Sequence, residues 1–177
     1  MSDSKIVYRA TRFHVEQRIV PGADGREHPH DILVHPGAAV VLPLLEDGRV
    51  VMIENHREAV RMELLELPAG TLDDGEAPIE CARRELSEET GYTAGRMEPL
   101  TDFYTSPGIL TEHMHAFVAT QLTDGKTAHE PTERIRVTPM TWEDAMRAVG
   151  AGRVKDGKTL STLLFFDRFG RGKGPRP

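Results

Sequence analysis

The chain has 177 residues, 38% of them hydrophobic, which predicts one domain with a sizeable core over residues 1–170. A formal net charge of −6 and a pI near 5.8 argue against nucleic-acid or acidic-membrane partners, which are bound by clustered Lys and Arg. One cysteine excludes an internal disulfide, and the sequence has neither a signal-peptide run nor ~20 consecutive apolar residues, so we expect a cytoplasmic protein without a membrane partner.

The N-terminal segment is predicted to form β-strands. Ile6 to Val20 carries apolar residues largely in alternation, and the turn-forming residues 21–25 follow it. This pattern predicts strand structure that leads into a hairpin with Asp31 to His35. For His28 and His30, between these segments, the alternatives are a metal-binding pair and an ordinary polar loop, and we favour the loop.

A second hairpin is predicted in the next segment. The apolar runs 37–45 and 49–54 are joined by the turn Glu46-Asp47-Gly48, so we expect two central strands. Arg57 follows them, either as a surface charge or as a two-pronged phosphate ligand. Glu63 to Leu67 predicts another short strand, which a Pro-Ala-Gly turn closes.

An amphipathic helix is predicted over residues 76–90. Apolar residues recur there at helical spacing, as at Ile79, Ala82 and Leu86. Pro78 suits a first turn, where a missing N–H costs nothing, and Gly91 suits the left-handed residue that ends a helix. At about 100° per residue, three carboxylates gather on one face, those of Glu85, Glu88 and Glu89.

Three like charges on one face oppose helix formation, so the cluster needs an explanation. One is a solvated charged face that Arg83 and Arg84 compensate. The other is a site for Mg²⁺, which takes oxygen ligands and is shared between carboxylates and substrate phosphates. We favour the second explanation because residues 70–92 match the Nudix box, the signature of hydrolases that split nucleoside diphosphates linked to another moiety. The matching residues are Gly70, Glu76, Arg84, Glu85, Leu86, Glu88, Glu89, Gly91 and Tyr92.

The second half of the chain is predicted to contain further strands and two helices. The strands are expected at 97–104, 114–121 and 135–140. Thr141, with Asp144 three residues on, is expected to begin a helix that runs to about Ala151. A last helix, from Lys158 to Phe169, is apolar around much of its circumference, so we expect it to be buried against the domain or a second subunit. Residues 171–177 predict a flexible basic tail.

Another motif competes for the functional assignment. Gly152, Gly157, Lys158 and Thr159 have the spacing of the phosphate-binding P-loop. That loop needs a buried strand directly before it, so that backbone N–H groups point at the phosphates, and here a helix precedes it. We therefore interpret the segment as a turn between helices, in which Lys158 has no chemical role.

Beyond the box, the chain is similar to the ADP-ribose pyrophosphatase branch of the Nudix family over roughly Phe13 to Phe166. The similarity is carried by VHPGAAVVLPL, NHREAV, LELPAGTLDDGE and FYTSPG, by the context of Glu112, and by Pro107, sixteen residues after Gly91. The resemblance implies an α/β fold, an α/β/α sandwich around a mixed β-sheet, with N-terminal strands at 6–35 that pair across a homodimer. It also implies Mg²⁺-dependent hydrolysis of ADP-ribose to AMP and ribose 5-phosphate, with Mn²⁺ as a substitute ion.

The resemblance also implies roles for individual residues. The Mg²⁺ ligands are expected to be Glu85, Glu88, Glu89 and the carbonyl of Ala69. Gly70, Glu76 and Arg84 are expected to hold the loop and orient the carboxylates. The expected substrate-binding residues are Arg57, as a diphosphate clamp, with Pro107, Gly108 and Glu112, the last of which positions the terminal ribose or a metal-bound water. A glutamate in the loop before strand 135–140 is expected to be the general base, and both Glu130 and Glu133 satisfy this description.

Other functions are compatible with parts of this pattern. A related branch that acts on GDP-mannose shares the arrangement of residues 106–112 and a motif like Asp156-Gly157-Lys158-Thr159, so GDP-mannose or another nucleoside diphosphate sugar is the alternative substrate. A Nudix-fold sensor that binds without cleaving is a second alternative, but such proteins typically lose box glutamates, and all of them are present here.

Overall fold

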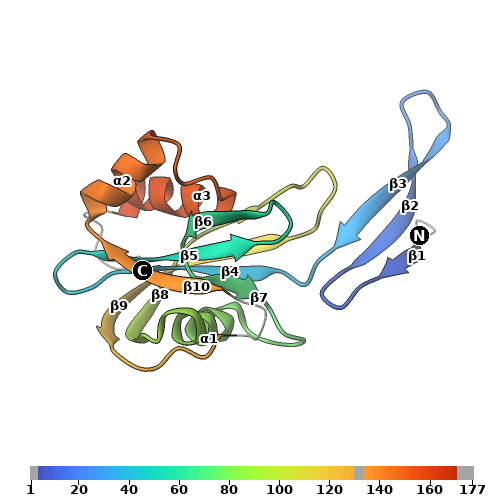
Figure 1. The fold of residues 1–177 in the computed structure, drawn as a ribbon. Helices are drawn as coiled ribbons and strands as arrows, with labels where there is room; N and C mark the ends of the chain where they lie inside the picture. The colour runs from blue at the N-terminus through green and yellow to red at the C-terminus, as the bar shows by residue number, and fades with distance from the viewer. Residues whose placement is uncertain (1–3, 130–133, 171–177) are drawn as a thin grey trace.

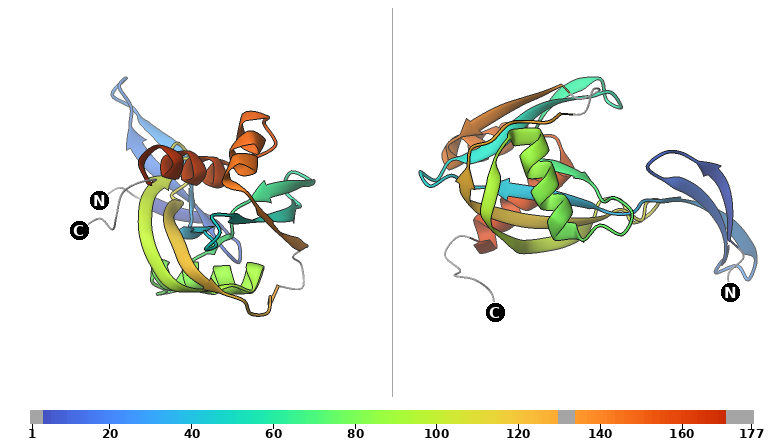
Figure 2. Two further views of the ribbon diagram at one scale, coloured as in Figure 1. Left: turned by 90° about the vertical axis from the view of Figure 1, so that its left-hand side faces the viewer. Right: turned by 90° about the horizontal axis from the view of Figure 1, so that it is seen from below.

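An N-terminal arm projects from a layered body in the computed structural model, which describes residues 4–129 and 134–170 (Figure 1). The arm is an antiparallel sheet in the order β1-β2-β3, made of β1 (Ser4–Arg9), β2 (His14–Pro21) and β3 (Glu27–Val34). Two further views show the arm standing clear of the body and joined to it at one end (Figure 2).

The structure of the arm differs from two sequence-based expectations. Segment 6–20 is divided by a turn in which the Ala10 N–H donates to the Phe13 carbonyl (2.9 Å), and apolar residues on both sides of that turn conceal the break. His28 and His30 lie in β3 and not in a loop. Pro29 between them is tolerated because β3 is an edge strand, whose outer side needs no ladder hydrogen bond.

Two sheets form the centre of the body. The first is mixed, with the order β7-β4-β9-β8, and its β4 and β9 run parallel. The second is antiparallel, with the order β10-β5-β6. The strands are β4 (Ala38–Pro43), β5 (Val50–Arg57), β6 (Met62–Glu66), β7 (Ala69–Thr71), β8 (Thr93–Tyr104), β9 (His113–Thr123) and β10 (Ile135–Met140).

The second predicted hairpin is only partly correct. Its turn forms, with the Leu45 N–H donating to the Arg49 carbonyl (2.9 Å), but β4 and β5 then enter different sheets and touch through a bridge between Leu44 and Val50. All six residues of β4 are buried. A strand that is apolar on both faces does not reveal from its pattern which strand it will pair with.

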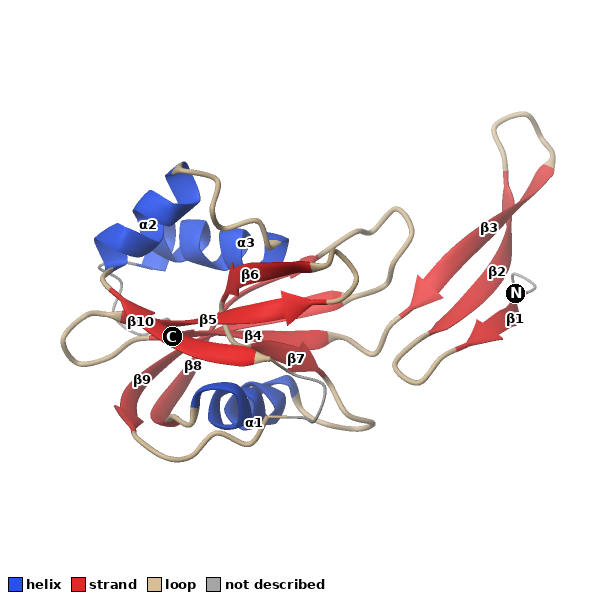
Figure 3. Cartoon of the chain, viewed as in Figure 1, coloured by secondary structure: helices blue, strands red, loops and turns tan. Residues whose placement is uncertain are grey.

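Helices cover both sides of the sheets (Figure 3). On one side α1 (Pro78–Thr90) packs on the mixed sheet, where Ala39 and Val41 of β4 contact its Leu86 in a shared core. On the other side Val40 and Leu42 belong to a second core with α2 (Trp142–Gly150) and α3 (Gly157–Phe165). The alternation of β4 between two cores explains the α/β/α arrangement, which confirms the expected fold class.

The C-terminal helices position the end of the chain. Thr141 caps α2 by accepting the Asp144 N–H, as predicted. The last helix is shorter than expected, because α3 ends at Phe165 and Phe166–Gly170 form a π-helical turn. One side of α3 is buried against the body, whereas Leu164 is 48% exposed. Residues 171–177, predicted as a tail, lie outside the described residues, and no helix within the described ranges has the length and apolar composition needed to cross a bilayer.

Candidate active site

The acidic cluster lies on α1, whose ends are set by two residues. Pro78 takes the first position, and Gly91 follows the last turn with a φ of 78°, a left-handed conformation that suits glycine. Glu85 and Glu89 are 8% and 2% exposed, so both carboxylates are withdrawn from bulk water. The side chain of Glu88 is 41% exposed and stands at the opening of the cluster.

Arg84 ties the cluster to the preceding loop. Its Nε and Nη2 donate to the two carboxylate oxygens of Glu76, each at 2.9 Å, and Nη2 also donates to the Thr71 carbonyl (3.1 Å). Its Nη1 donates to Glu85 Oε1 (2.5 Å) and Glu88 Oε2 (3.2 Å). Hydrogen bonds from Arg84 lower the pKa of Glu76 to about 2, and those to Glu76 raise the pKa of Arg84. The loop and the helix are thus held together by permanently charged groups.

The short strand β7 shapes the space around two of the carboxylates. A Cβ atom at Gly70 would lie 1.8 Å from Glu85 Oε1, so the absence of a side chain there leaves room for that carboxylate. The N–H of Ala69 donates to Glu89 Oε2 (2.9 Å) in a buried hydrogen bond. On the inner face of α1, Cys81 is fully buried, and desolvation raises the pKa of its thiol to about 12.

A cavity of about 680 Å³ opens beside the carboxylates. Its lining includes acidic and basic side chains from several elements and a turn of the arm: Thr11, Arg12, Arg57, Ala69, Gly70, Asp73, Asp74, Arg84, Glu85, Glu88, Glu112 and Lys158. The cavity therefore brings together anionic groups suited to a cation and cationic groups suited to a phosphate, which is the combination that a metal-dependent reaction of a phosphoanhydride needs.

The carboxylate set fits a hard divalent cation. Nη1 of Arg84 lies between Glu85 and Glu88, which shows that these two side chains converge on one positive group. In the part of the chain that the structure describes, no three His, Cys, Asp or Glu side chains are already spaced to hold an ion. Glu85 and Glu88 supply carboxylate oxygens, the ligand type that hard divalent cations take.

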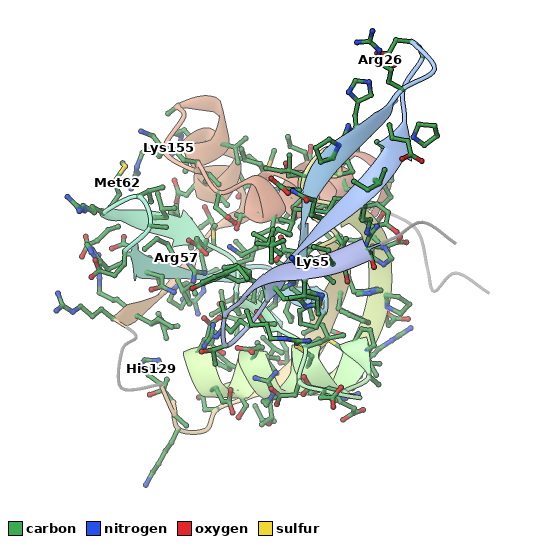
Figure 4. The ribbon with its side chains drawn as sticks, turned by 90° about the vertical axis from the view of Figure 1, so that its right-hand side faces the viewer. Lys5, Arg26, Arg57, Met62, His129 and Lys155 are labelled. Atoms are coloured by element: carbon green, nitrogen blue, oxygen red, sulfur yellow. The ribbon has the colours of Figure 1, made fainter. Side chains whose placement is uncertain are left out.

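Two cations on the cavity wall share a buried carboxylate. Arg57 at the end of β5 (Figure 4) donates from Nε and Nη2 to Glu66, at 2.9 Å and 2.6 Å. Lys158, in the first turn of α3, donates to the same carboxylate (2.7 Å) and to Asp156 (2.8 Å). Hydrogen bonding to Glu66 raises the pKa of Arg57. Lys158 lies on the cavity wall, and its interpretation as a residue without a chemical role stays a prediction.

The remaining predicted substrate-binding residues divide into two groups. Glu112 lines the cavity and accepts a hydrogen bond from Thr105 Oγ1 (2.6 Å). Pro107 and Gly108 lie in an exposed turn that does not line the cavity. That turn docks on the end of β3, where the Leu33 N–H donates to the carbonyl of Ile109 (2.8 Å). The two general-base candidates, Glu130 and Glu133, lie outside the described residues.

Sequence reasoning missed several residues that the cavity brings together. Thr11 and Arg12 were hidden because their turn was interpreted as part of a strand. Glu66 is fully buried at the end of β6, and a glutamate inside the apolar run Leu64 to Leu67 was the available signal for it.

The comparison with known families matches this fold and this cavity. The NUDIX domain profile matches residues 34–162, which is well over half of the chain. The chain therefore belongs to the NUDIX domain family, whose hydrolases generally use a divalent metal ion.

Three individual proteins are similar to this chain over most of its length. The chain is 39% identical over 144 residues to the ADP-ribose pyrophosphatase of Bacillus subtilis (strain 168), a match that covers 80% of this chain and 78% of the relative. It is 34% identical over 159 residues to the methanol dehydrogenase activator of Bacillus methanolicus, covering 89% and 85%. It is also 38% identical over 138 residues to a GDP-mannose pyrophosphatase of Yersinia pestis (strain Pestoides F), covering 73% and 69%.

A solved structure supports the fold. The crystal structure of an ADP compounds hydrolase superposes with a TM-score of 0.84 at 21% sequence identity, covering 98% of this chain and 95% of that chain. The match includes the N-terminal segment, since almost the whole chain is aligned.

Proposed function

We propose that this protein hydrolyses ADP-ribose to AMP and ribose 5-phosphate in a reaction that depends on Mg²⁺, for which Mn²⁺ substitutes. The observation that carries the proposal is the cavity that places Glu85 and Glu88 together with Arg57 and Lys158. The 39% identity to an ADP-ribose pyrophosphatase supports the choice of substrate.

In this proposal the metal ion is held by Glu85, Glu88 and Glu89 with the carbonyl of Ala69. When bound, it screens the diphosphate, polarises a phosphorus–oxygen bond and lowers the pKa of water. The hydrogen bond from the Ala69 N–H holds Glu89 Oε2 in a fixed direction. Arg84 and Glu76 keep the loop against α1, so that the carboxylates stay close without a costly reorganisation.

The substrate is proposed to lie along the cation-bearing wall of the cavity. Arg57 is the candidate clamp for the diphosphate, and Glu112 is the candidate partner of the terminal ribose or of the attacking water. Pro107 and Gly108 are proposed to act through the turn that they form. Glu130 or Glu133 is proposed as the general base. If one of them has this role, its substitution by Gln should lower turnover by about 10²-fold with little change in KM.

The test is a substrate panel with a matched active-site variant. ADP-ribose, GDP-mannose, other nucleotide sugars, NADH and ATP are incubated with Mg²⁺ and with chelator, and products are separated by chromatography. We expect ADP-ribose to give the highest kcat/KM and the Glu88→Gln/Glu89→Gln double variant to lose activity. Turnover of every substrate by the double variant at the wild-type rate would remove the proposal, and binding of ADP-ribose without turnover by the wild type would favour a sensor.

GDP-mannose is the second candidate substrate. The 38% identity to a GDP-mannose pyrophosphatase supports it, and the same panel separates the two, since the ratio of their kcat/KM values measures the preference directly.

We also propose that the arm pairs with that of a second copy in a homodimer and that the protein works in the cytoplasm. Support for the dimer is the exposure of every residue of β1, including Tyr8 at 58%, on a strand with an open edge. Light scattering coupled to size exclusion tests it, with removal of residues 1–9 expected to give monomers.

A further inference from the structure

The last turn of α1 carries two of the carboxylates proposed to hold the metal ion, those of Glu88 and Glu89. A helix leaves its last four carbonyl groups without partners from within the helix, and helix ends fray when these groups are not satisfied. The direction in which Glu88 and Glu89 point therefore depends on what binds the carbonyls at this end of α1.

The helix satisfies only part of this end itself. The N–H of Gly91 donates to the Ser87 carbonyl (2.9 Å). Gly91 then turns the chain away from the helix axis in its left-handed conformation, with a φ of 78°. The carbonyls of Glu88 and Glu89 take their partners from another segment.

That segment is the loop after β9, residues 124–129. The Ala128 N–H donates to the Glu88 carbonyl (2.9 Å), and Nε2 of His129 lies 3.0 Å from the carbonyl oxygen of Glu89. Because a carbonyl oxygen only accepts, Nε2 carries the proton in this contact. Two successive residues of the loop thus cap the backbone of two successive residues of the proposed metal site.

The loop approaches the end of the helix closely through two glycines. A Cβ atom at Gly125 would lie 2.6 Å from the Gly91 carbonyl oxygen, and one at Gly91 would lie 3.2 Å from the carbonyl oxygen of Gly125. The two backbones are therefore closer together than a side chain at Gly125 would allow. This close approach brings Ala128 and His129 within hydrogen-bonding distance of the last turn.

His129 is the residue of this loop that is turned inward. Residues 124–128 are exposed, whereas His129 is half-buried beside α1 (Figure 4). Residues 124–129 also form no strand or helix, so neither a sheet ladder nor a helical turn holds them. The contacts with the end of α1 consequently fix this part of the loop and the last helical turn against each other.

We propose that His129 is a positioning residue of the metal site, which holds the last turn of α1 closed so that Glu88 and Glu89 keep their direction. Removal of a group that orients the ligands of a metal ion typically lowers metal affinity by about 10- to 100-fold. The inference rests on the proposed function for the identity of the metal ligands. It goes beyond that function because it assigns a role to a residue outside the cavity lining.

The experiment combines a metal titration with hydrogen exchange in the complete chain. Mn²⁺ is the probe, and its free concentration is measured by electron paramagnetic resonance without substrate. We expect His129→Leu to raise the Kd for Mn²⁺ about tenfold, and His129→Gln, which keeps a side-chain N–H, to stay within about twofold of the wild type. In His129→Leu the amides of residues 88–91 should also exchange about tenfold faster, because the last turn opens more often.

Thr127→Leu is the matched control. Thr127 is exposed on the same loop, and the variant introduces the same side chain two residues away, so the Kd and the exchange rates should not change. Faster exchange in His129→Leu with an unchanged Kd for Mn²⁺ would show that the histidine supports the helix end without positioning the ligands. Unchanged exchange would show that it does not hold that turn, and either result would overturn the inference.

The outcomes also distinguish this inference from the proposed function. Wild-type protein that turns over no substrate of the panel but binds Mn²⁺ in a manner that depends on His129 would overturn the proposed reaction alone. Turnover of ADP-ribose by the wild type, together with a His129→Leu variant that binds Mn²⁺ normally, would overturn this inference alone.

Discussion

Replacing Gly70 with alanine tests whether the position of the Glu85 carboxylate matters for activity more than for stability. The added Cβ would lie 1.8 Å from Glu85 Oε1 and 2.0 Å from its Cδ, whereas real Cβ contacts are essentially never under 3.0 Å. The carboxylate must therefore move by about 1.2 Å or more. The atoms that move are at the end of a flexible side chain, so we expect the variant to fold.

We expect the substitution to lower catalytic activity much more than stability. Misplacement of a catalytic group by about 1 Å lowers rates by about 10²-fold, so we expect at least this loss in kcat for Gly70→Ala, together with weaker metal activation. The free energy of unfolding should fall by no more than about 1 kcal/mol, which corresponds to about 2–4 °C in Tm for a domain of this size. Activity as a function of Mg²⁺ concentration and differential scanning calorimetry measure the two effects.

The matched control is Gly150→Ala. Gly150 lies in α2, has no atom within 4 Å of an added Cβ and has no positive φ, so this variant should keep full activity and wild-type stability or better. Wild-type kcat and metal dependence in Gly70→Ala would refute the assignment of Glu85 to the site, whereas loss of folding in Gly70→Ala would refute the argument that its carboxylate can move.

Three other predictions follow from the site and its supports. Because the pKa of Glu76 is lowered to about 2 from 4.5, its contribution to stability is present above about pH 4.5 and is lost as the pH falls toward 2. The difference in unfolding free energy between wild type and Glu76→Gln, measured by urea titration, should therefore shrink over that pH range. A difference that stays constant would contradict this prediction. Mg²⁺ at a hundred times its Kd should stabilise the wild type by about 2.7 kcal/mol in calorimetry but stabilise Glu89→Gln far less, and equal stabilisation would remove Glu89 from the ligand set. Thr159→Val leaves the buried Leu67 N–H without its acceptor and should cost about 1–3 kcal/mol in urea unfolding, against less than about 0.5 kcal/mol for the exposed Ser161→Ala control.

Local signals in the sequence predicted individual elements well. Helix 76–90 was predicted from its apolar spacing with Pro78 and Gly91 at its ends, and α1 spans Pro78–Thr90. Strand 135–140 coincides with β10. In these segments the periodicity, the caps and the surrounding turns all agree, so a single sequence is sufficient.

Tertiary relations were harder to predict, because they depend on partners distant in the chain. The pattern of β4 and β5 gave their position but not their assignment to two sheets. The carboxylates of the site were found because they share one helix, whereas Glu66 and Lys158 are 92 residues apart and meet only after α3 docks on β6. Thr11 and Arg12 reach the cavity only because the arm turns back toward the body.

The burial of Cys81 has a practical consequence. It is the chain's one cysteine, it is fully buried on the inner face of the acidic helix, and a pKa of about 12 keeps it protonated at neutral pH. A thiol introduced on the exterior, for example at an exposed position of the arm, is therefore the group that a maleimide dye will modify. Fluorescence reporters of arm position can be attached to the otherwise native chain without first removing its own sulfhydryl.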